Sequence, residues 1–404
     1  MKKNILVGQS GGPTAAINSS LYGVIAESLQ AGAQIDTVYG MSNGISGFLK
    51  DQVITLSDLT EDKLSLLPTT PGAYLGSCRY KLPEDLTDPV YETLWEKFEK
   101  WQIGYVLYIG GNDSMDTVSK LSRYAAAIDS DIRFIGVPKT IDNDLINTDH
   151  TPGFGSAAKF VASMVRQMVM DCEVYQTKAV TIIEVMGRAA GWLTGASALA
   201  RKYDGDNPVL IYLPEVDFSP EKMIADIEEL LKQKNALVIC VSEGIHDADG
   251  KLICEYGGDS GLDVFGHKNL TGCGKVLEEM IRTKLGIKVR SVELNITQRC
   301  CATEASLADI QEAENCGREG VKLALSGATG LMVSMKREEG REYQISYPGT
   351  DVHAVCNQER LVPLEWINPA GNDITEAFIK YAKPLIQGES RPPMEDGLPK
   401  FLFR

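Results

Sequence analysis

The stretch YVLYIGGNDSMDTVSKLSRYAAA (residues 105–127) contains the pattern that decides how this chain folds. Five apolar residues lead into a pair of glycines, and a helix-like segment follows. Similar apolar runs, most of them ending in a Gly or Asp turn, occur at residues 4–8, 133–138, 179–187, 235–244 and 330–335. Continuous apolar strands that alternate with helices are typical of a parallel sheet covered on both faces. We therefore predict an α/β fold.

Length and composition narrow the class of protein. The chain has 404 residues, which is too long for one compact core and predicts two domains. Hydrophobic residues make up 44% and charged residues 24%, as in soluble globular proteins. The formal net charge of −15 disfavours nucleic acid and anionic membrane as partners. An anionic substrate would therefore need a local cluster of Lys and Arg.

The termini and the cysteines indicate a cytoplasmic protein. The N-terminal sequence MKKNILVGQS becomes polar too early for a secretory signal, and no run of about 18 apolar residues could span a bilayer. The nine cysteines contain no CxxC pair, and the adjacent Cys300 and Cys301 are poorly placed to bridge each other. These patterns predict reduced thiols.

In parallel sheets, ligands bind where the loops after the strands gather, which here means the loops at 9–13, 110–114, 138–144, 186–191 and 242–244. In the first loop, Gly11 and Gly12 let backbone N–H groups approach an anion. The same glycines could equally only make a turn. The segment is neither GxGxxG nor a lysine-bearing P-loop, which disfavours a dinucleotide site and a Walker-type ATPase.

The second loop, GGNDS (110–114), repeats the pattern with polar side chains. Gly110 and Gly111 again permit close approach, and Asn112, Asp113 and Ser114 would point polar groups into the same crevice. Ser114 could equally be only the N-cap of the following helix.

The segment PKTIDND (138–144) combines two acids with a cation directly after an apolar strand. One of Asp142 and Asp144 can accept a proton from a hydroxyl nucleophile, and the other can orient it or hold Mg²⁺ directly or through water. Thr140 can bond a phosphate oxygen, and Lys139 adds positive charge for a transferring phosphoryl group. Phosphoryl transfer needs these groups. A solvated turn with Asx caps would not explain them after a buried strand.

Further charged residues follow later apolar runs. Arg188 in EVMGRAAG offers a guanidinium fork for a sugar phosphate, and Glu243 in SEG could accept hydrogen bonds from sugar hydroxyls. Arg290 and Arg299 lie in VRSVELNITQR. Each of these alone could equally form a surface ion pair, but their repeated position favours a common site.

Taken together, SGGPTAAIN, LGSCR, GGNDS, PKTIDND, EVMGR, SEG and QR, in this order and spacing over about residues 4–335, resemble the phosphofructokinase family. The resemblance implies two Rossmann-like three-layer α/β domains with mostly parallel sheets and the site in the cleft between them. Residues 1–153 with about 298–335 would bind the phosphoryl donor, and 154–297 the sugar phosphate. Residues 336–404 would form a C-terminal extension packed on the body. The family usually forms homodimers or homotetramers.

The resemblance also assigns roles within the catalytic loop. Asp142 is similar to the family's base on the 1-hydroxyl of fructose 6-phosphate, with Asp144, Lys139 and Thr140 beside it. The implied sugar-phosphate contacts are Thr140, Asp142, Met186, Gly187, Arg188, Glu243, Arg290 and Arg299. The implied donor contacts are Gly11, Gly12, Arg79, Gly111, Asn112, Asp113 and Ser114. Mg²⁺ is the expected cofactor, near Asn112 and Asp113, directly or through water.

Two positions separate the donors used in this family. ATP-dependent members typically carry glycine at the positions of Asp113 and Lys139, whereas pyrophosphate-dependent members carry Asp and Lys. A carboxylate at 113 would repel the α-phosphate of ATP by about 4 kcal/mol at about 4 Å and an effective dielectric of 20. The expected reaction is reversible, Mg²⁺-dependent transfer from pyrophosphate to fructose 6-phosphate, a step of glycolysis. ATP-dependent phosphofructokinase is the alternative.

The chain also departs from the family pattern. Asn112 replaces a usual aspartate, Ala179 a frequent arginine, and Ile296 a common sugar-contacting histidine, so sedoheptulose 7-phosphate stays open as a second acceptor. Two other classes fit less well. A non-catalytic regulatory subunit would be expected to lack Asp142 or Lys139. A relative that shares only the glycine loop, as NAD kinases do, would not carry TIDND followed by EVMGR.

Overall fold

The computed structural model describes residues 3–257, 272–340 and 342–403. The chain divides into two compact units. Unit 1 comprises Met1–Ser156, Arg299–Arg360 and Ile386–Arg404, and unit 2 comprises Ala157–Gln298 and Leu361–Leu385. The C-terminal residues, expected as one extension, are thus divided between the two units. The ligands assigned to each domain from the sequence stay predictions.

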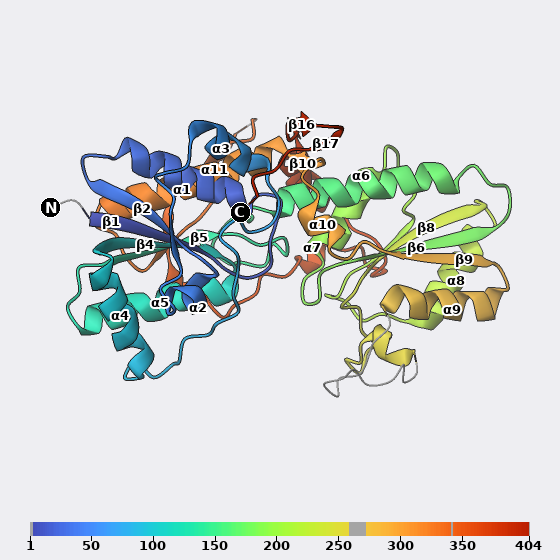
Figure 1. Ribbon diagram of the computed structural model, residues 1–404. Helices are drawn as coiled ribbons and strands as arrows, with labels where there is room; N and C mark the ends of the chain where they lie inside the picture. The colour runs from blue at the N-terminus through green and yellow to red at the C-terminus, as the bar shows by residue number, and fades with distance from the viewer. Residues whose placement is uncertain (1–2, 258–271, 341, 404) are drawn as a thin grey trace. The chain divides into compact units, whose positions relative to one another are not determined.

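Unit 1 is built on a seven-stranded sheet with the order β14-β11-β5-β4-β1-β2-β3. The five inner strands are parallel to one another, and the edge strands β3 and β14 are each antiparallel to the inner strand beside them. The strands are β1 (Lys3–Gln9), β2 (Ile35–Met41), β3 (Val53–Thr55), β4 (Ile103–Gly110), β5 (Arg133–Pro138), β11 (Leu331–Val333) and β14 (Gly349–Asp351). Figure 1 shows helices on both faces of this sheet.

Alternating side chains of β1 explain why both faces are covered. Ile5 and Val7 point into one buried cluster with α1 (Ile17–Gln30) and α11 (Leu307–Leu325). Leu6 points into a second cluster with α4 (Pro89–Lys100) and α5 (Asn112–Ala127). Because successive strand residues face opposite sides, an uninterrupted apolar strand requires an apolar layer on each side.

Helices α1 and α11 pack closely because glycines lie in their contact. A Cβ added at Gly23 would lie 2.0 Å from the Glu314 carbonyl oxygen, and one at Gly317 would lie 2.1 Å from the Ser20 carbonyl oxygen. Neither position could hold a larger residue without separating the helices. The close contact fixes α11 on unit 1, although its sequence lies about 300 residues after α1.

Unit 2 contains a four-stranded parallel sheet with the order β7-β8-β6-β9. The strands are β6 (Ala179–Val185), β7 (Leu210–Tyr212), β8 (Ala236–Ser242) and β9 (Lys288–Glu293). Helices α8 (Pro220–Leu230) and α9 (Cys273–Leu285) share a buried cluster with one face of the sheet. Helix α6 (Phe154–Cys172) runs along the other face (Figure 1).

An aromatic group joins the C-terminal part of unit 2 to its body. Trp192, at the start of α7 (Trp192–Ala196), lies within 6.0 Å, centroid to centroid, of the rings of Trp366, Phe378 and Tyr381. Phe378 and Tyr381 belong to α12 (Glu376–Ala382). Such aromatic contacts explain why Leu361–Leu385 belongs to unit 2 although Arg360 belongs to unit 1.

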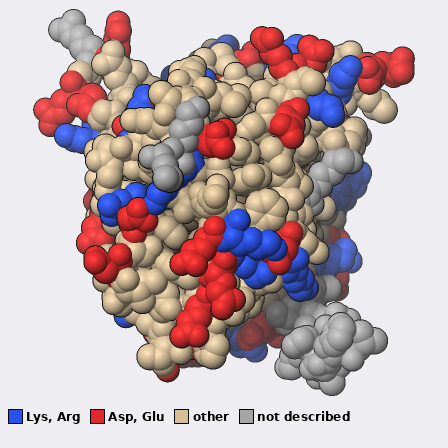
Figure 2. Space-filling view, turned by 60° about the vertical axis from the view of Figure 1, so that its left-hand side comes forward, with Lys and Arg blue, Asp and Glu red and all other residues tan. Residues whose placement is uncertain are grey.

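Further short α-helices and strands connect these elements. They are α2 (Gly44–Phe48), α3 (Glu61–Leu66), α10 (Thr297–Cys300), β10 (Ala305–Ser306), β12 (Lys336–Arg337), β13 (Ile345–Ser346), β15 (Glu389–Ser390), β16 (Met394–Glu395) and β17 (Leu398–Pro399). Among the described helices, none is long and apolar enough to cross a membrane. Figure 2 shows Lys and Arg interspersed with Asp and Glu on one face. The predicted α/β class with mostly parallel sheets is confirmed.

Candidate active site

The predicted donor-binding and catalytic loops of unit 1 follow three neighbouring parallel strands. Gln9 at the end of β1 pairs with Ile109, and Gly110 at the end of β4 pairs with Pro138 at the end of β5. Because these strands end level with one another, the loops that follow them lie side by side. The register therefore gathers residues 10–12, 111–114 and 139–144 at one edge of the sheet.

Lys139 lies against the glycine turn. Its Nζ donates a hydrogen bond of 2.6 Å to the Gly12 carbonyl oxygen. Gly11 has a φ of +76°, which a side chain would strain, and a Cβ there would lie 3.4 Å from Lys139 Nζ. A Cβ at Gly12 would lie 3.4 Å from Arg299 Nη1. The two glycines thus leave room for two cations at this turn.

The environment of Lys139 lowers its pKa towards neutrality. The side chain is 2% exposed, and burial lowers its pKa to about 8 against the opposing attraction of Asp142 and Asp144. Nearby Arg299 lowers the pKa further by like-charge repulsion. A cation that water does not screen interacts more strongly with an anion brought beside it.

Asp142 is held in place by Thr140. The Asp142 backbone N–H donates to Thr140 Oγ1 at 3.1 Å, and that hydroxyl lies 3.4 Å from Asp142 Oδ2. Burial raises the pKa of Asp142, while the Thr140 hydroxyl, Lys139 and Arg299 oppose the rise. A carboxylate with a raised pKa is a stronger base than an exposed one. The arrangement suits proton abstraction from a hydroxyl.

Asp144 is the more perturbed of the two acids. Burial, followed by the neighbouring charge of Asp142, raises the pKa of Asp144 to about 6. Its Oδ1 is buried and has no hydrogen-bond partner within the described part of the chain. A buried oxygen of this kind can accept a hydrogen bond or coordinate a cation supplied with a ligand.

The loop after β4 differs in part from its predicted roles. Helix α5 begins at Asn112 with Gly111 as N-cap, so Ser114 is not the N-cap; it is 1% exposed and packs on Gly110. Asn112 Oδ1 accepts the backbone N–H of Asn357 at 2.5 Å, so the amide also ties α5 to the C-terminal segment of unit 1.

Asp113 instead has an exposed carboxylate. Its side chain is 72% exposed, and Oδ1 lies 3.0 Å from Lys81 Nζ. Sequence reasoning missed Lys81, although it lies two residues after Arg79. The exposed Arg79 lies in a loop that is tied to the glycine turn, because Ser77 Oγ donates to the Gly11 carbonyl oxygen at 2.7 Å.

The residues also bear on the expected Mg²⁺. No group of three or more His, Cys, Asp or Glu side chains that could hold a metal ion occurs among the described residues. Mg²⁺ usually needs only one or two carboxylates, with substrate phosphates and waters completing its shell. The free oxygen of Asp144 and the exposed carboxylate of Asp113 fit that mode. Asn112 fits it less well, because its Oδ1 is already hydrogen-bonded.

Unit 2 brings together a second set of predicted site residues at the carboxyl ends of β6 and β8. The Gly187 N–H lies 3.3 Å from Glu243 Oε1, and the Met186 N–H lies 3.4 Å from Gln298 Oε1. Gly187 has a φ of +135°, and the Ser242 hydroxyl donates to its carbonyl oxygen. These contacts fix the turn that carries the predicted sugar-phosphate residues.

Arg188 follows this turn and is exposed, so its guanidinium is accessible to an anion. A small pocket beside the turn is lined by Glu184, Val185, Met186, Glu243, Glu293 and Asn295. Burial, with the charge of Glu293 adding to it, raises the pKa of Glu184, although the Gly274 N–H opposes the rise. Sequence reasoning missed Glu184, Glu293 and Asn295.

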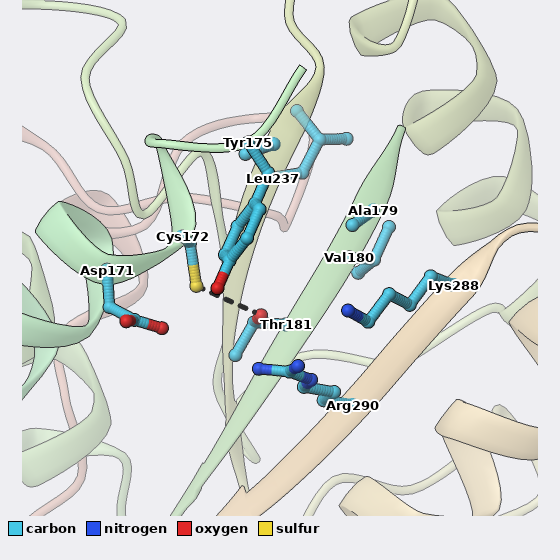
Figure 3. A pocket seen from close by; sticks show the side chains of 10 residues that line it. Asp171, Cys172, Tyr175, Ala179, Val180, Thr181, Leu237, Lys288 and Arg290 are labelled. Atoms are coloured by element: carbon cyan, nitrogen blue, oxygen red, sulfur yellow. Dashed lines mark hydrogen bonds between the residues drawn. The ribbon is translucent and has the colours of Figure 1, made fainter. Parts of the chain in front are cut away.

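Arg290 does not lie with this set in unit 2. It pairs with Thr181 in the middle of β9 and lines a different pocket with Asp171, Cys172, Tyr175 and Lys288 (Figure 3). The first residues of β6, β8 and β9 line the same pocket, so it lies toward the opposite end of the sheet from Met186 and Glu243. Its assignment to the sugar phosphate stays a prediction.

Comparison with known proteins identifies close relatives. A family model for phosphofructokinase matches residues 4–324. The pyrophosphate–fructose 6-phosphate 1-phosphotransferase of Halomonas elongata is 39% identical over 401 residues, which cover 98% of this chain and 95% of that protein. The protein of the same name from Methylococcus capsulatus is 37% identical and covers 99% of this chain and 95% of its own length.

A solved structure has the same fold. The crystal structure of a pyrophosphate-dependent phosphofructokinase from Marinobacter aquaeolei matches this chain with a TM-score of 0.89 and 36% sequence identity. The match covers 99% of this chain and 95% of that one.

Proposed function

Because the chain belongs to the phosphofructokinase family, we propose that it transfers a phosphoryl group from pyrophosphate to the 1-hydroxyl of fructose 6-phosphate. The products are fructose 1,6-bisphosphate and phosphate, and the reaction is reversible. The observation that carries the proposal is the buried Lys139, held against the glycine turn beside Asp142. The names of the relatives support pyrophosphate over ATP as the donor.

Asp142 acts as the base in this proposal. It accepts the proton of the 1-hydroxyl as that oxygen attacks the terminal phosphorus of pyrophosphate, and the bond to the departing phosphate breaks. Thr140 orients the carboxylate through its hydroxyl. Lys139 and Arg299, both beside Gly12, balance negative charge on the transferring group.

The donor is selected by charge and space near α5. Asp113 repels the additional phosphate of ATP, whereas Lys139 attracts the compact charge of pyrophosphate. Gly11, Gly12, Gly111, Ser114 and Arg79 complete the proposed donor contacts. Lys81, 3.0 Å from Asp113, holds that carboxylate at the start of the helix. ATP-dependent phosphofructokinase remains the alternative that a donor comparison would detect.

The sugar phosphate is assigned mainly to unit 2. The proposed contacts in this unit are Met186, Gly187, Arg188 and Glu243. Arg290 lies apart from them and stays a sequence prediction, and the sequence also predicts Thr140, Asp142 and Arg299 as sugar-phosphate contacts. The exposed Arg188 is suited to the 6-phosphate because a guanidinium can bind two phosphate oxygens at once.

Mg²⁺ is the proposed cofactor, expected near Asn112 and Asp113 directly or through water, and the exposed carboxylate of Asp113 and the free oxygen of Asp144 are better suited to hold it than the hydrogen-bonded amide of Asn112. When bound, the ion neutralises charge on the phosphates. We further propose that the protein works in glycolysis in the cytoplasm as a homodimer or homotetramer, without nucleic acid or membrane as a partner.

The test is product identification. The purified protein is incubated with pyrophosphate, fructose 6-phosphate and Mg²⁺, and the mixture is followed by phosphorus NMR. The proposal expects fructose 1,6-bisphosphate and phosphate in equal amounts, and expects pyrophosphate to form when the two products are supplied. Hydrolysis of pyrophosphate without phosphorylation of the sugar would contradict it, as would no consumption of pyrophosphate.

A further inference from the structure

A buried histidine lies near the end of the loop that begins with the catalytic residues. His150 is 1% exposed and has a carboxylate at each ring nitrogen: Asp149 Oδ2 at 2.8 Å from Nδ1, and Glu312 Oε2 at 2.7 Å from Nε2. Because a carboxylate only accepts hydrogen bonds, both ring nitrogens must carry a proton. The side chain is therefore an imidazolium held between two anions.

The surrounding groups balance and fix this charge. Arg337 Nη2 lies 2.8 Å from Asp149 Oδ2, and the Tyr343 hydroxyl donates to Glu312 Oε1 at 2.6 Å. Tyr343 also lies 3.5 Å from His150 Nε2. Burial alone lowers the pKa of His150, but the charges and hydrogen bonds of Glu312 and Asp149 outweigh it and raise the pKa to about 9. The group is therefore charged at neutral pH.

The residue after His150 contacts the catalytic loop directly. The Thr151 N–H donates to Asn143 Oδ1 at 3.1 Å, and Thr151 Oγ1 donates to the Thr140 carbonyl oxygen at 2.9 Å. The Thr140 N–H donates in turn to the Pro152 carbonyl oxygen at 3.1 Å. The segment 150–153 is thus bonded to the residues on both sides of Asp142.

Helix α11 is the support on which this segment rests. Its Asp309 accepts the N–H groups of Gly153 and Ser156 at 2.8 and 3.0 Å, and its Glu312 holds His150. Glu312 lies 162 residues from His150 in sequence. The helix therefore anchors the returning part of the loop at two points, and only the contact at His150 adjoins Thr151.

We propose that His150 is a positioning residue for the reaction: held between Asp149 and Glu312, it fixes segment 150–153 and, through Thr151, sets where Thr140 and Asp142 stand. The inference rests on the proposed function only for the reaction that is measured. His150 touches neither substrate nor reacting atoms in this account. Misplacing a base by about 1 Å can cost about a hundredfold in rate, which is the scale on which such a contact acts.

The primary test compares His150→Gln with His353→Gln in the full-length protein. Gln keeps a polar side chain but lacks the positive charge from which His150 donates hydrogen bonds to both carboxylates. The control makes the same change at an exposed histidine of unit 1. We expect kcat with pyrophosphate to fall about tenfold to a hundredfold in His150→Gln, with a smaller change in KM for fructose 6-phosphate. The control should stay within about twofold of wild type.

The pH dependence of thermal stability identifies the charge. Because the pKa of His150 is raised from 6.5 to about 9 by folding, its stabilising contribution is complete below pH 6.5 and is lost as pH rises through 9. The wild-type Tm should therefore fall relative to that of His150→Gln across this range. His353→Gln is measured in parallel as the control for the substitution.

A second variant keeps the inference testable if His150→Gln fails to fold. Glu312→Gln removes the charge on α11 and should lower kcat in the same direction. The double variant His150→Gln/Glu312→Gln can form a neutral amide pair, so it should lose less than the two single losses multiplied together. Lower Tm with unchanged kcat, in whichever single variant folds, would overturn the positioning role. A wild-type protein without activity would instead contradict the proposed function.

Discussion

The loops after β5 and β6 share a sequence pattern but differ in burial. Each follows an apolar parallel strand and carries a cation. Lys139 after β5 is 2% exposed, whereas Arg188 after β6 is exposed. The first loop is covered because the chain returns over it and bonds to it through Thr151.

This difference in burial gives the two loops different roles, one in phosphoryl transfer and one in substrate binding. Burial shifts the pKa values of Lys139 and Asp144 to about 8 and about 6, so the first loop holds groups whose protonation can change near neutral pH. The exposed Arg188 after β6 presents a guanidinium that an anion can reach from water. The account therefore assigns catalytic rate mainly to the loop after β5 and substrate affinity mainly to the loop after β6.

The largest expected effect comes from removing the base. Asp142→Asn keeps the shape of the side chain but cannot accept the proton, so kcat should fall about 10²–10⁴-fold with pyrophosphate. Binding of fructose 6-phosphate, measured by calorimetry, should change little. Asp129→Asn makes the same substitution at an exposed position of unit 1 and serves as the control. Near-normal turnover in Asp142→Asn would remove this residue from the mechanism.

A smaller effect, on affinity rather than rate, is expected from a change in the loop after β6. Arg188→Ala removes charge-assisted hydrogen bonds worth about 1.5–3 kcal/mol, so KM for fructose 6-phosphate should rise about tenfold to a hundredfold. Arg282→Ala, on the surface of α9 in unit 2, is the control for loss of an arginine. An unchanged KM in Arg188→Ala would mean that the residue has only a structural role.

The donor choice should respond to Asp113. Asp113→Gly removes the repulsion of the ATP α-phosphate and should raise kcat/KM for ATP by about tenfold, which needs about 1.4 kcal/mol. Lys139→Gly should chiefly damage the pyrophosphate reaction. The double variant should move furthest towards ATP, with non-additive effects because both groups act on one ligand. Unchanged use of ATP in Asp113→Gly would reject repulsion as the cause of the preference.

The smallest expected effect is on the pH dependence of kcat/KM, which the titrating residues of the loop after β5 should determine. Lys139 loses its charge as pH rises through about 8, so kcat/KM for pyrophosphate should decline on the alkaline side. The acid side should follow the raised pKa values of Asp142 and Asp144. In Lys139→Arg the alkaline decline should move to higher pH, because a guanidinium stays protonated. A decline that stays at the same pH would assign it to another group.

The sequence predicted the sheet class because the strand signal is local. The apolar runs at 105–110 and 133–138 lie within or coincide with β4 and β5. β2 was not singled out, because Asp36 and Thr37 interrupt its apolar run and the strand is partly exposed. β9, with Lys288, Arg290 and Glu293, was missed as a strand for the same reason.

The contacts that shape the site depend on distant residues and could not be predicted in this way. Nothing near His150 in the sequence indicates Glu312, and nothing near Asn112 indicates Asn357. The N-cap alternative for Ser114 was wrong because the helix starts earlier, at Asn112, with Gly111 as its cap. The predicted residues of the first loop gather at one sheet edge, whereas Arg290 lies apart from Met186 and Glu243 in its unit.

The central claim is that this chain uses pyrophosphate to phosphorylate fructose 6-phosphate. The most direct measurement is kcat/KM of the wild-type protein for pyrophosphate and for ATP, each with saturating fructose 6-phosphate at the same free Mg²⁺. The account predicts a value for pyrophosphate at least about tenfold higher, the ratio that about 1.4 kcal/mol of discrimination gives. An equal or higher value for ATP would contradict it.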